Sequence, residues 1–347
     1  MSEAGEAVPS ADVQVGKVFA WRRGFNAMFL IDLGVKLGLF RALADAPARP
    51  TDLANKLGLH EPYVATWCLT AYGFELLDAA ADGAYRLAPH FDTILASPGH
   101  PRYLGGYAKL GTDFASEDFR ALLGAFRDGG KIPFQGRSDA FAEVIAESTA
   151  GLHFITARKI LPELPGLAER LAAGACLVEL GCGVGRLLLA LAKANPQAQI
   201  RGVDIDPTGL RRARQALATA GYGERVQVLE GELGAVIAPR SADALVMVEV
   251  LHEIAQPIRP RVLRACGEVL KPGGWIVILD ETYPSTLAEA RAPEFAFPLQ
   301  TGFEELLWGN IIPTREEQER LLNDAGFEPP QRSLLGEGFT LLTARKR

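Results

Sequence analysis

Residues 178–185 read VELGCGVG; they end a mainly apolar stretch that begins at Ala175, and a second mainly apolar stretch follows Arg186. Gly181, Gly183 and Gly185 allow the chain to turn tightly and allow a ligand to approach the backbone closely. The pattern therefore predicts a strand, a glycine-rich ligand loop and a helix in direct succession.

The chain around and after this loop alternates between strand-like and helix-like segments. Strands are predicted over residues 175–180, 199–203, 226–230, 244–248, 275–279 and 339–345, and helices over 186–194, 208–218, 258–269 and 316–325. Such alternation is typical of a mainly parallel sheet that helices cover on both faces. The predicted fold class is α/β, with a Rossmann-like sheet in a domain that covers residues 166–347.

The first half of the chain has the pattern of a helical domain, which we assign to residues 1–165. Helices are predicted to begin near Thr51 and after His60, and a hairpin is predicted to turn at Asp82-Gly83, which together indicate a winged helix. The segment 15–43, with breaks at Gly34 and Gly38, is more apolar than solvent-facing helices usually are. Because exposed apolar surface usually binds a partner, we predict a homodimer in which this domain supplies the dimer contact and a lid over the substrate.

Composition and charge exclude several classes of protein. The 347 residues are 48% hydrophobic and carry a net charge of −6, which suits a globular chain with a full core and not a binder of polyanions. Residues 57–84, which include the predicted recognition helix, contain no Lys or Arg, so binding to nucleic acid is not expected. No apolar run reaches the roughly 20 residues of a membrane helix. Without a signal pattern, and with four cysteines too scattered for a disulfide framework, the expected location is the cytoplasm.

Acidic residues near the ends of the first three predicted strands suggest which ligand the loop binds. Asp204 follows Gly181 by 23 residues, close to the roughly 20 expected for a carboxylate that binds ribose hydroxyls. Gly231 and Glu232 end the third strand, where a carboxylate can meet an adenine amino group. Glu179, just before the loop, would repel a pyrophosphate but suits a ligand with an ammonium group. The predicted cofactor is therefore S-adenosylmethionine and not a nicotinamide dinucleotide.

The ordered segments VELGCGVG, GVDIDP, EGEL, VMVEVLHEI and LKPGGWIVILDE resemble the motifs of class I S-adenosylmethionine-dependent methyltransferases. The helical first half resembles the dimerisation domain of the small-molecule O-methyltransferase superfamily. This resemblance implies a seven-stranded sheet and a small-molecule substrate. It also implies that the ribose is held by Asp204 in preference to Asp206. The other cofactor contacts that it implies are Glu179, Gly181, Gly183 and Gly185 for the methionine part, Ile205 for the adenine face, and Gly231 with Glu232 for the adenine edge.

His252, in the segment EVLHEI after the fourth predicted strand, is the candidate catalytic residue. It lies at the carboxyl edge of the sheet, where α/β proteins bind ligands. Its position also resembles that of the catalytic histidine of phenol O-methyltransferases. In one mechanism, His252 is the general base for a hydroxyl group, and Asp280 orients its other ring nitrogen. Glu253 would support His252 or accept the proton.

In the other mechanism, Glu249, His252 and Glu305 bind one divalent Fe, Mn or Zn ion. This arrangement resembles that of 2-oxo acid C-methyltransferases, although their ligands are Met, His and His. A metal there would chelate a 2-oxo acid and stabilise its enolate, whose C3 attacks the methyl group.

Of the possible functions, we therefore favour metal-assisted C3-methylation of a 2-oxo acid in amino-acid or natural-product biosynthesis. The alternatives are O-methylation of a phenol or other hydroxyl group and, in a different class, a winged-helix ligand-binding regulator with a vestigial methyltransferase fold.

Overall fold

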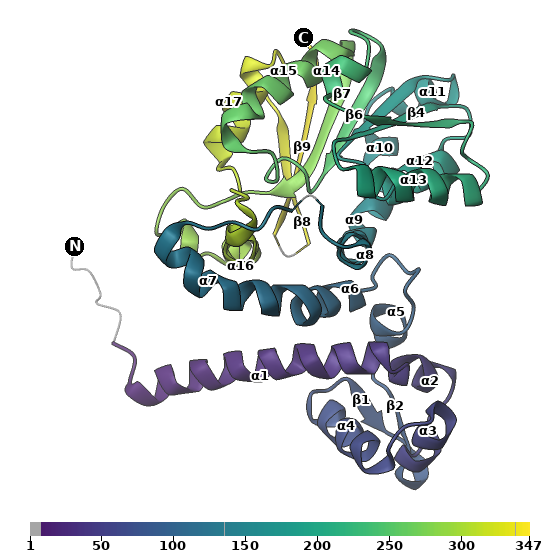
Figure 1. Cartoon of the computed structure of the whole chain (residues 1–347), viewed down its shortest axis with the longest axis vertical. Coiled ribbons are helices and arrows are strands. Elements are labelled where there is room, and N and C mark those ends of the chain that lie inside the picture. Colours follow the sequence, from purple (N-terminus) through teal and green to yellow (C-terminus); the bar gives the residue numbers. More distant parts are fainter. Residues whose placement is uncertain (1–7, 135, 337) are drawn as a thin grey trace. The chain divides into compact units, whose positions relative to one another are not determined.

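The computed structural model describes residues 8–134, 136–336 and 338–347. The chain forms two compact units, Met1–Asp113 and Phe114–Arg347 (Figure 1). The sequence prediction places the domain boundary at 165/166, whereas the contacts divide the chain at 113/114. The difference arises because the helices between these two points pack within the unit that holds the large sheet.

The first unit consists of helices and one small hairpin. Ser10 caps the long first helix by accepting a hydrogen bond from the Val13 N–H. The predicted break falls at Gly38, whose φ of 73° suits glycine, whereas the helix continues through Gly34. The elements are α1 (Ala11–Lys36), α2 (Leu39–Asp45), α3 (Pro50–Leu57), α4 (Glu61–Gly73), β1 (Leu77–Ala79), β2 (Tyr85–Leu87), α5 (Phe91–Leu95) and α6 (Gly105–Lys109).

The predicted hairpin is confirmed, because β1 and β2 pair antiparallel around a turn at Ala81–Gly83. Asp82 and Gly83 both have positive φ in this turn. Phe40, Leu53 and Cys68 lie at the centre of the core that α2, α3 and α4 share, each with at most 1% of its surface exposed.

The second unit begins with α7 (Ser116–Asp128), α8 (Asp139–Ser148), α9 (Ala150–Ile155), α10 (Leu161–Glu163) and α11 (Leu167–Ala172). Its strands are β3 (Cys176–Leu180), β4 (Gln199–Asp204), β5 (Val226–Glu230), β6 (Ala242–Val248), β7 (Leu270–Glu281), β8 (Gln331–Leu335) and β9 (Phe339–Arg345). The helices among them are α12 (Arg186–Ala194), α13 (Pro207–Thr219), α14 (Leu233–Val236), α15 (Arg259–Val269), α16 (Ala296–Glu304) and α17 (Arg315–Asp324).

These strands form one seven-stranded sheet in the order β5-β4-β3-β6-β7-β9-β8. The first five strands are parallel, and β9 is antiparallel to both of its neighbours. The strand order reverses between β3 and β6, so the connections that leave these two strands diverge. A ligand crevice is expected at the carboxyl ends of β3 and β6.

Helices cover both faces of this sheet, as Figure 1 shows. One core layer contains apolar side chains of α12 and α13, and the other contains those of α15 and α17. Every residue of β6 is buried, which explains why this strand is apolar except at Asp243. The predicted α/β fold with a mainly parallel sheet is confirmed. No helix in the described ranges combines the length and apolar character needed to cross a membrane.

Candidate active site

The glycine-rich loop follows β3, and its three glycines have φ values that disfavour any other residue. Gly181, Gly183 and Gly185 have φ of 76°, 47° and 80°. A Cβ at Gly181 would lie 2.4 Å from Cγ2 of Val250. Glycine at this position therefore lets the loop pack directly against the segment that contains His252.

Asp204 ties this loop to the end of β4. Its Oδ2 accepts the Gly183 N–H at 2.8 Å, and its Oδ1 accepts the N–H groups of Ile205 and Asp206 at 2.7 and 2.9 Å. Burial raises the pKa of Asp204, and these N–H bonds oppose the increase. Asp206 has a different role, because its carboxylate caps α13 through the Thr208 and Gly209 N–H groups.

Glu179 lies at the base of the loop with 3% of its surface exposed. Its buried Oε2 accepts no hydrogen bond from any residue that the structure describes. Burial, followed by the charge of Asp204, raises the pKa of Glu179 well above its ordinary value. A buried acceptor without a donor fits a cofactor that brings an ammonium group.

The remaining predicted cofactor residues lie at the neighbouring strand ends. Ile205 is 61% exposed directly after β4, so its side chain is free to pack on a flat group. Gly231 follows β5 with a φ of 136°. Glu232 is exposed and pairs with Arg261 at 3.0 Å, so an adenine amino group would have to share its carboxylate.

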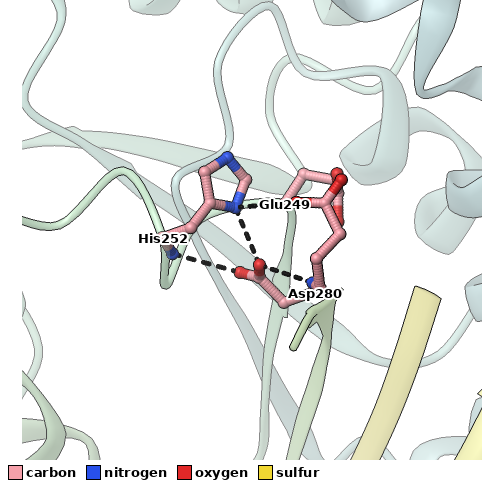
Figure 2. Close-up of side chains that lie close together, drawn as sticks. Glu249, His252 and Asp280 are labelled. Atoms are coloured by element: carbon pink, nitrogen blue, oxygen red, sulfur yellow. Dashed lines mark hydrogen bonds and ion pairs between the residues drawn. The ribbon is translucent and has the colours of Figure 1, made fainter. Parts of the chain in front are cut away.

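The turn after β6 brings His252 to the carboxyl edge of the sheet. Glu249 has a φ of 57°, uncommon for a residue other than glycine, and this conformation turns the chain directly after the strand. The N–H groups of Leu251 and His252 then donate to Oδ2 of Asp280 at 2.7 and 3.3 Å. Figure 2 shows Asp280 beneath the His252 ring, with Glu249 beside the ring.

Both ring nitrogens of His252 face carboxylates. Nδ1 lies 2.7 Å from Oδ1 of Asp280, and Nε2 lies 3.3 Å from Oε2 of Glu305. Burial alone would lower the pKa of His252, but the charges of Asp280 and Glu305 raise it well above its ordinary value. Burial would raise the pKa of Asp280, but the His252 charge lowers it. Asp280 and Glu305 therefore favour the protonated form of the ring.

More acidic residues surround His252 than the sequence analysis identified. Burial raises the pKa values of Glu253 and Glu281 to about 8. Glu281 is 1% exposed, and its Oε1 accepts the Thr301 hydroxyl at 2.8 Å. Its Oε2, like Oε1 of Glu249, receives no hydrogen bond within the described ranges. The signal that could have identified Glu281 is the pair of consecutive acids that ends β7.

One group of side chains has the spacing of metal ligands. Glu249, His252, Asp280 and Glu281 each offer one ligand atom, and these atoms lie within 4.8 Å of one another. Glu305, predicted as a ligand with Glu249 and His252, is not in this group. It contacts Nε2 of His252 instead and accepts the Asn310 side-chain N–H at 2.8 Å.

Comparison with known proteins supports the methyltransferase class that the sequence motifs indicated. A family model described as a methyltransferase domain matches residues 178–276. The chain is 32% identical to the ubiquinone biosynthesis O-methyltransferase of Thiobacillus denitrificans, over 49% of this chain and 71% of that protein. It is 25% identical to the tetracenomycin polyketide synthesis 8-O-methyl transferase TcmO of Streptomyces glaucescens, over 90% of this chain and 91% of that protein. It is 24% identical to the 3-hydroxy-5-methyl-1-naphthoate 3-O-methyltransferase of Streptomyces sahachiroi, over 70% of each chain.

Solved structures share the fold over nearly the whole length. Human N-acetylserotonin methyltransferase in complex with S-adenosylmethionine aligns with a TM-score of 0.77 at 20% identity, over 99% of both chains. An O-methyltransferase family protein from Burkholderia thailandensis aligns with a TM-score of 0.75 at 18% identity, over 98% of this chain and 99% of that chain.

The sheet order, the glycine loop and the acids at the strand ends define an S-adenosylmethionine-dependent methyltransferase of class I. The chain belongs to the O-methyltransferase family of that class, and it acts on small molecules.

Proposed function

We propose that this enzyme methylates a hydroxyl group of a phenol-like small molecule, with His252 as the general base. The bond between Nδ1 of His252 and Oδ1 of Asp280, at 2.7 Å, carries the proposal. Asp280 accepts four N–H groups in all, so it fixes the ring and stabilises the positive charge that the ring gains. Nε2 is then the nitrogen that receives the substrate proton.

The chain's own residues have two tasks in this reaction. S-adenosylmethionine, when bound, supplies a methyl group on a positively charged sulfur, which is already a strong electrophile. The protein therefore has to place the hydroxyl oxygen in line with that methyl group and take its proton. We assign the cofactor contacts to Glu179, to the glycines of the loop, and to the strand-end residues Asp204, Ile205, Gly231 and Glu232.

A substrate screen tests this proposal. Purified enzyme with labelled S-adenosylmethionine is offered phenols, hydroxynaphthoates and 2-oxo acids, with and without EDTA. We expect transfer to a phenol oxygen that EDTA leaves unchanged, and a kcat about 100- to 10,000-fold lower in His252→Ala. Transfer to carbon of a 2-oxo acid, or full activity in His252→Ala, would reject the proposal.

Metal-assisted C-methylation of a 2-oxo acid remains the second candidate, and the grouped ligand atoms favour it. Two buried carboxylate oxygens there, on Glu249 and Glu281, receive no hydrogen bond from described residues, which suits a cation. A metal on Nδ1 of His252 would, however, displace its bond to Asp280, and for this reason we place the candidate second. About one Fe, Mn or Zn per chain by elemental mass spectrometry, lost in His252→Ala, would reverse the order.

We also propose that the enzyme is a homodimer that uses α1. Val15, Val18, Phe19, Phe25 and Phe29 lie on one face of this helix and are at least 37% exposed. An apolar face of this length suits a second copy of the same helix. The dimerisation and substrate-lid roles of residues 1–165 stay predictions.

A further inference from the structure

Arg259, the first residue of α15, is a charged side chain with none of its surface exposed. Its Nη1 bonds Oε1 of Glu317 at 2.9 Å, and its Nε donates to the Ile254 carbonyl at 2.9 Å. Its Nη2 donates to the carbonyls of His252, at 3.2 Å, and of Ile311. A buried charge is costly unless its donors are satisfied, and here one carboxylate and three carbonyls satisfy this arginine.

These acceptors belong to the two segments that form the base site. The carbonyls of His252 and Ile254 lie in the turn after β6, and Ile311 lies six residues after Glu305, on the segment before α17. Glu305 in turn faces Nε2 of His252. The guanidinium therefore joins the backbone that carries the imidazole to the backbone that carries its carboxylate partner.

We propose that Arg259 is a positioning residue, which holds the His252 ring and the Glu305 carboxylate at their working separation. The inference rests on the proposed role of His252 as base. Arginine suits this task because its planar group presents five N–H donors in a rigid fork, whereas lysine presents its donors from one atom. Arg259→Lys keeps the charge and loses the simultaneous contact with both segments.

The effect of Arg259→Lys follows from the groups around the ring. His252 is faced by Asp280 and Glu281 from β7, by Glu305 from the segment after α16, and by Glu249 and Glu253 from its own turn. If Arg259→Lys releases the segment that contains Ile311, Glu305 moves away from Nε2, and the ring is no longer held between Asp280 and Glu305.

The experiment compares Arg259→Lys and Glu317→Gln with wild type. We expect kcat to fall about 10- to 100-fold, since a misplacement of about 1 Å has effects of this size. KM for S-adenosylmethionine should stay within about twofold, because no bond of Arg259 reaches the glycine loop. Arg225→Lys is the matched control: Arg225 also donates to backbone carbonyls, those of Ala192, Asn195 and Pro196, and none of them belongs to the base site.

A second readout does not depend on turnover. The chain contains five histidines, so the His252 ring signals can be assigned by NMR of protein with labelled histidine and compared at one fixed pH. We expect these signals to shift in Arg259→Lys and Glu317→Gln, because the ring loses its position relative to Glu305. We expect no further shift when Arg259→Lys is added to Glu305→Gln, because both would act through the same contact.

Two results would overturn the inference. One is unchanged His252 ring signals and an unchanged kcat in folded Arg259→Lys and Glu317→Gln, with only thermal stability reduced. The other is additive shifts of the His252 ring signals in Arg259→Lys/Glu305→Gln. If His252 is not the base, His252→Ala retains activity, and the His252 ring signals of wild type and Arg259→Lys still test the role of Arg259. If Arg259→Lys does not fold, Glu317→Gln alone decides the matter.

Discussion

Asp280 accepts hydrogen bonds from Nδ1 of His252 and from three backbone N–H groups. Its charge raises the pKa of His252 above 6.5, so the neutral base forms only at higher pH and the wild-type rate should rise with pH beyond that value. In Asp280→Asn the charge is lost, and the acidic limb of kcat/KM should move to lower pH while the maximal rate falls. A profile measured from pH 5 to 9 checks this. An unmoved limb would show that another group titrates.

Asp204 and Asp206 stand two residues apart, and their hydrogen bonds separate their roles. Asp204 contacts the glycine loop, whereas Asp206 caps α13. Asp204→Ala should reduce S-adenosylmethionine binding below detection in calorimetry. Asp206→Ala should keep the affinity and lose about 1 kcal/mol of stability through the missing cap. The reverse pattern of affinities would move the ribose contact to Asp206.

At the scale of the element, β7 ends with two acids that the fold buries side by side. Glu281 has a pKa of about 8, raised first by burial, so its neutral form stabilises the fold below its ordinary pKa and this contribution is lost as pH rises through about 8. Glu281→Gln stays neutral and can still accept the Thr301 hydroxyl. Its melting temperature should exceed that of wild type at pH 9 and match it at pH 4. An equal difference at both pH values would mean that ionisation is not the cause.

The sequence patterns correctly located the strands that are buried inside the sheet. β3 and β6 are apolar except at Glu179 and Asp243, because helices cover both faces of the sheet, and the carboxyl ends of the neighbouring strands β4 and β7 pointed to Asp204 and Asp280. β8 gave no such signal, since its edge position leaves Gln331, Ser333 and Leu334 exposed. The short α14 was missed as well, because four residues carry no periodicity.

Contacts between distant segments could not be predicted in the same way. Glu305 follows His252 by 53 residues, so a resemblance to known enzymes, and not a local pattern, predicted that the two lie together; the structure has Glu305 at Nε2. Arg259 opens a helix, where an arginine usually faces solvent, and its acceptors are mostly backbone carbonyls that any sequence has. Side-chain identity alone does not encode such a contact, so the sequence indicated His252 with Asp280 and Glu305 but not Arg259.

At the scale of the molecule, the exposed apolar face of α1 predicts that two chains make the enzyme. Phe19 and Phe25 of α1 are 64% and 61% exposed, and full burial of one such side chain contributes about 1.5–3 kcal/mol. By light scattering we expect wild type to have a molar mass of twice 37.3 kDa. The molar mass of Phe25→Glu should shift toward that of one chain. Ala20→Glu places the same charge on the opposite, exposed side of α1 and should leave the mass unchanged. Wild type at 37.3 kDa, or equal dissociation of both variants, would remove this face of α1 as the dimer contact.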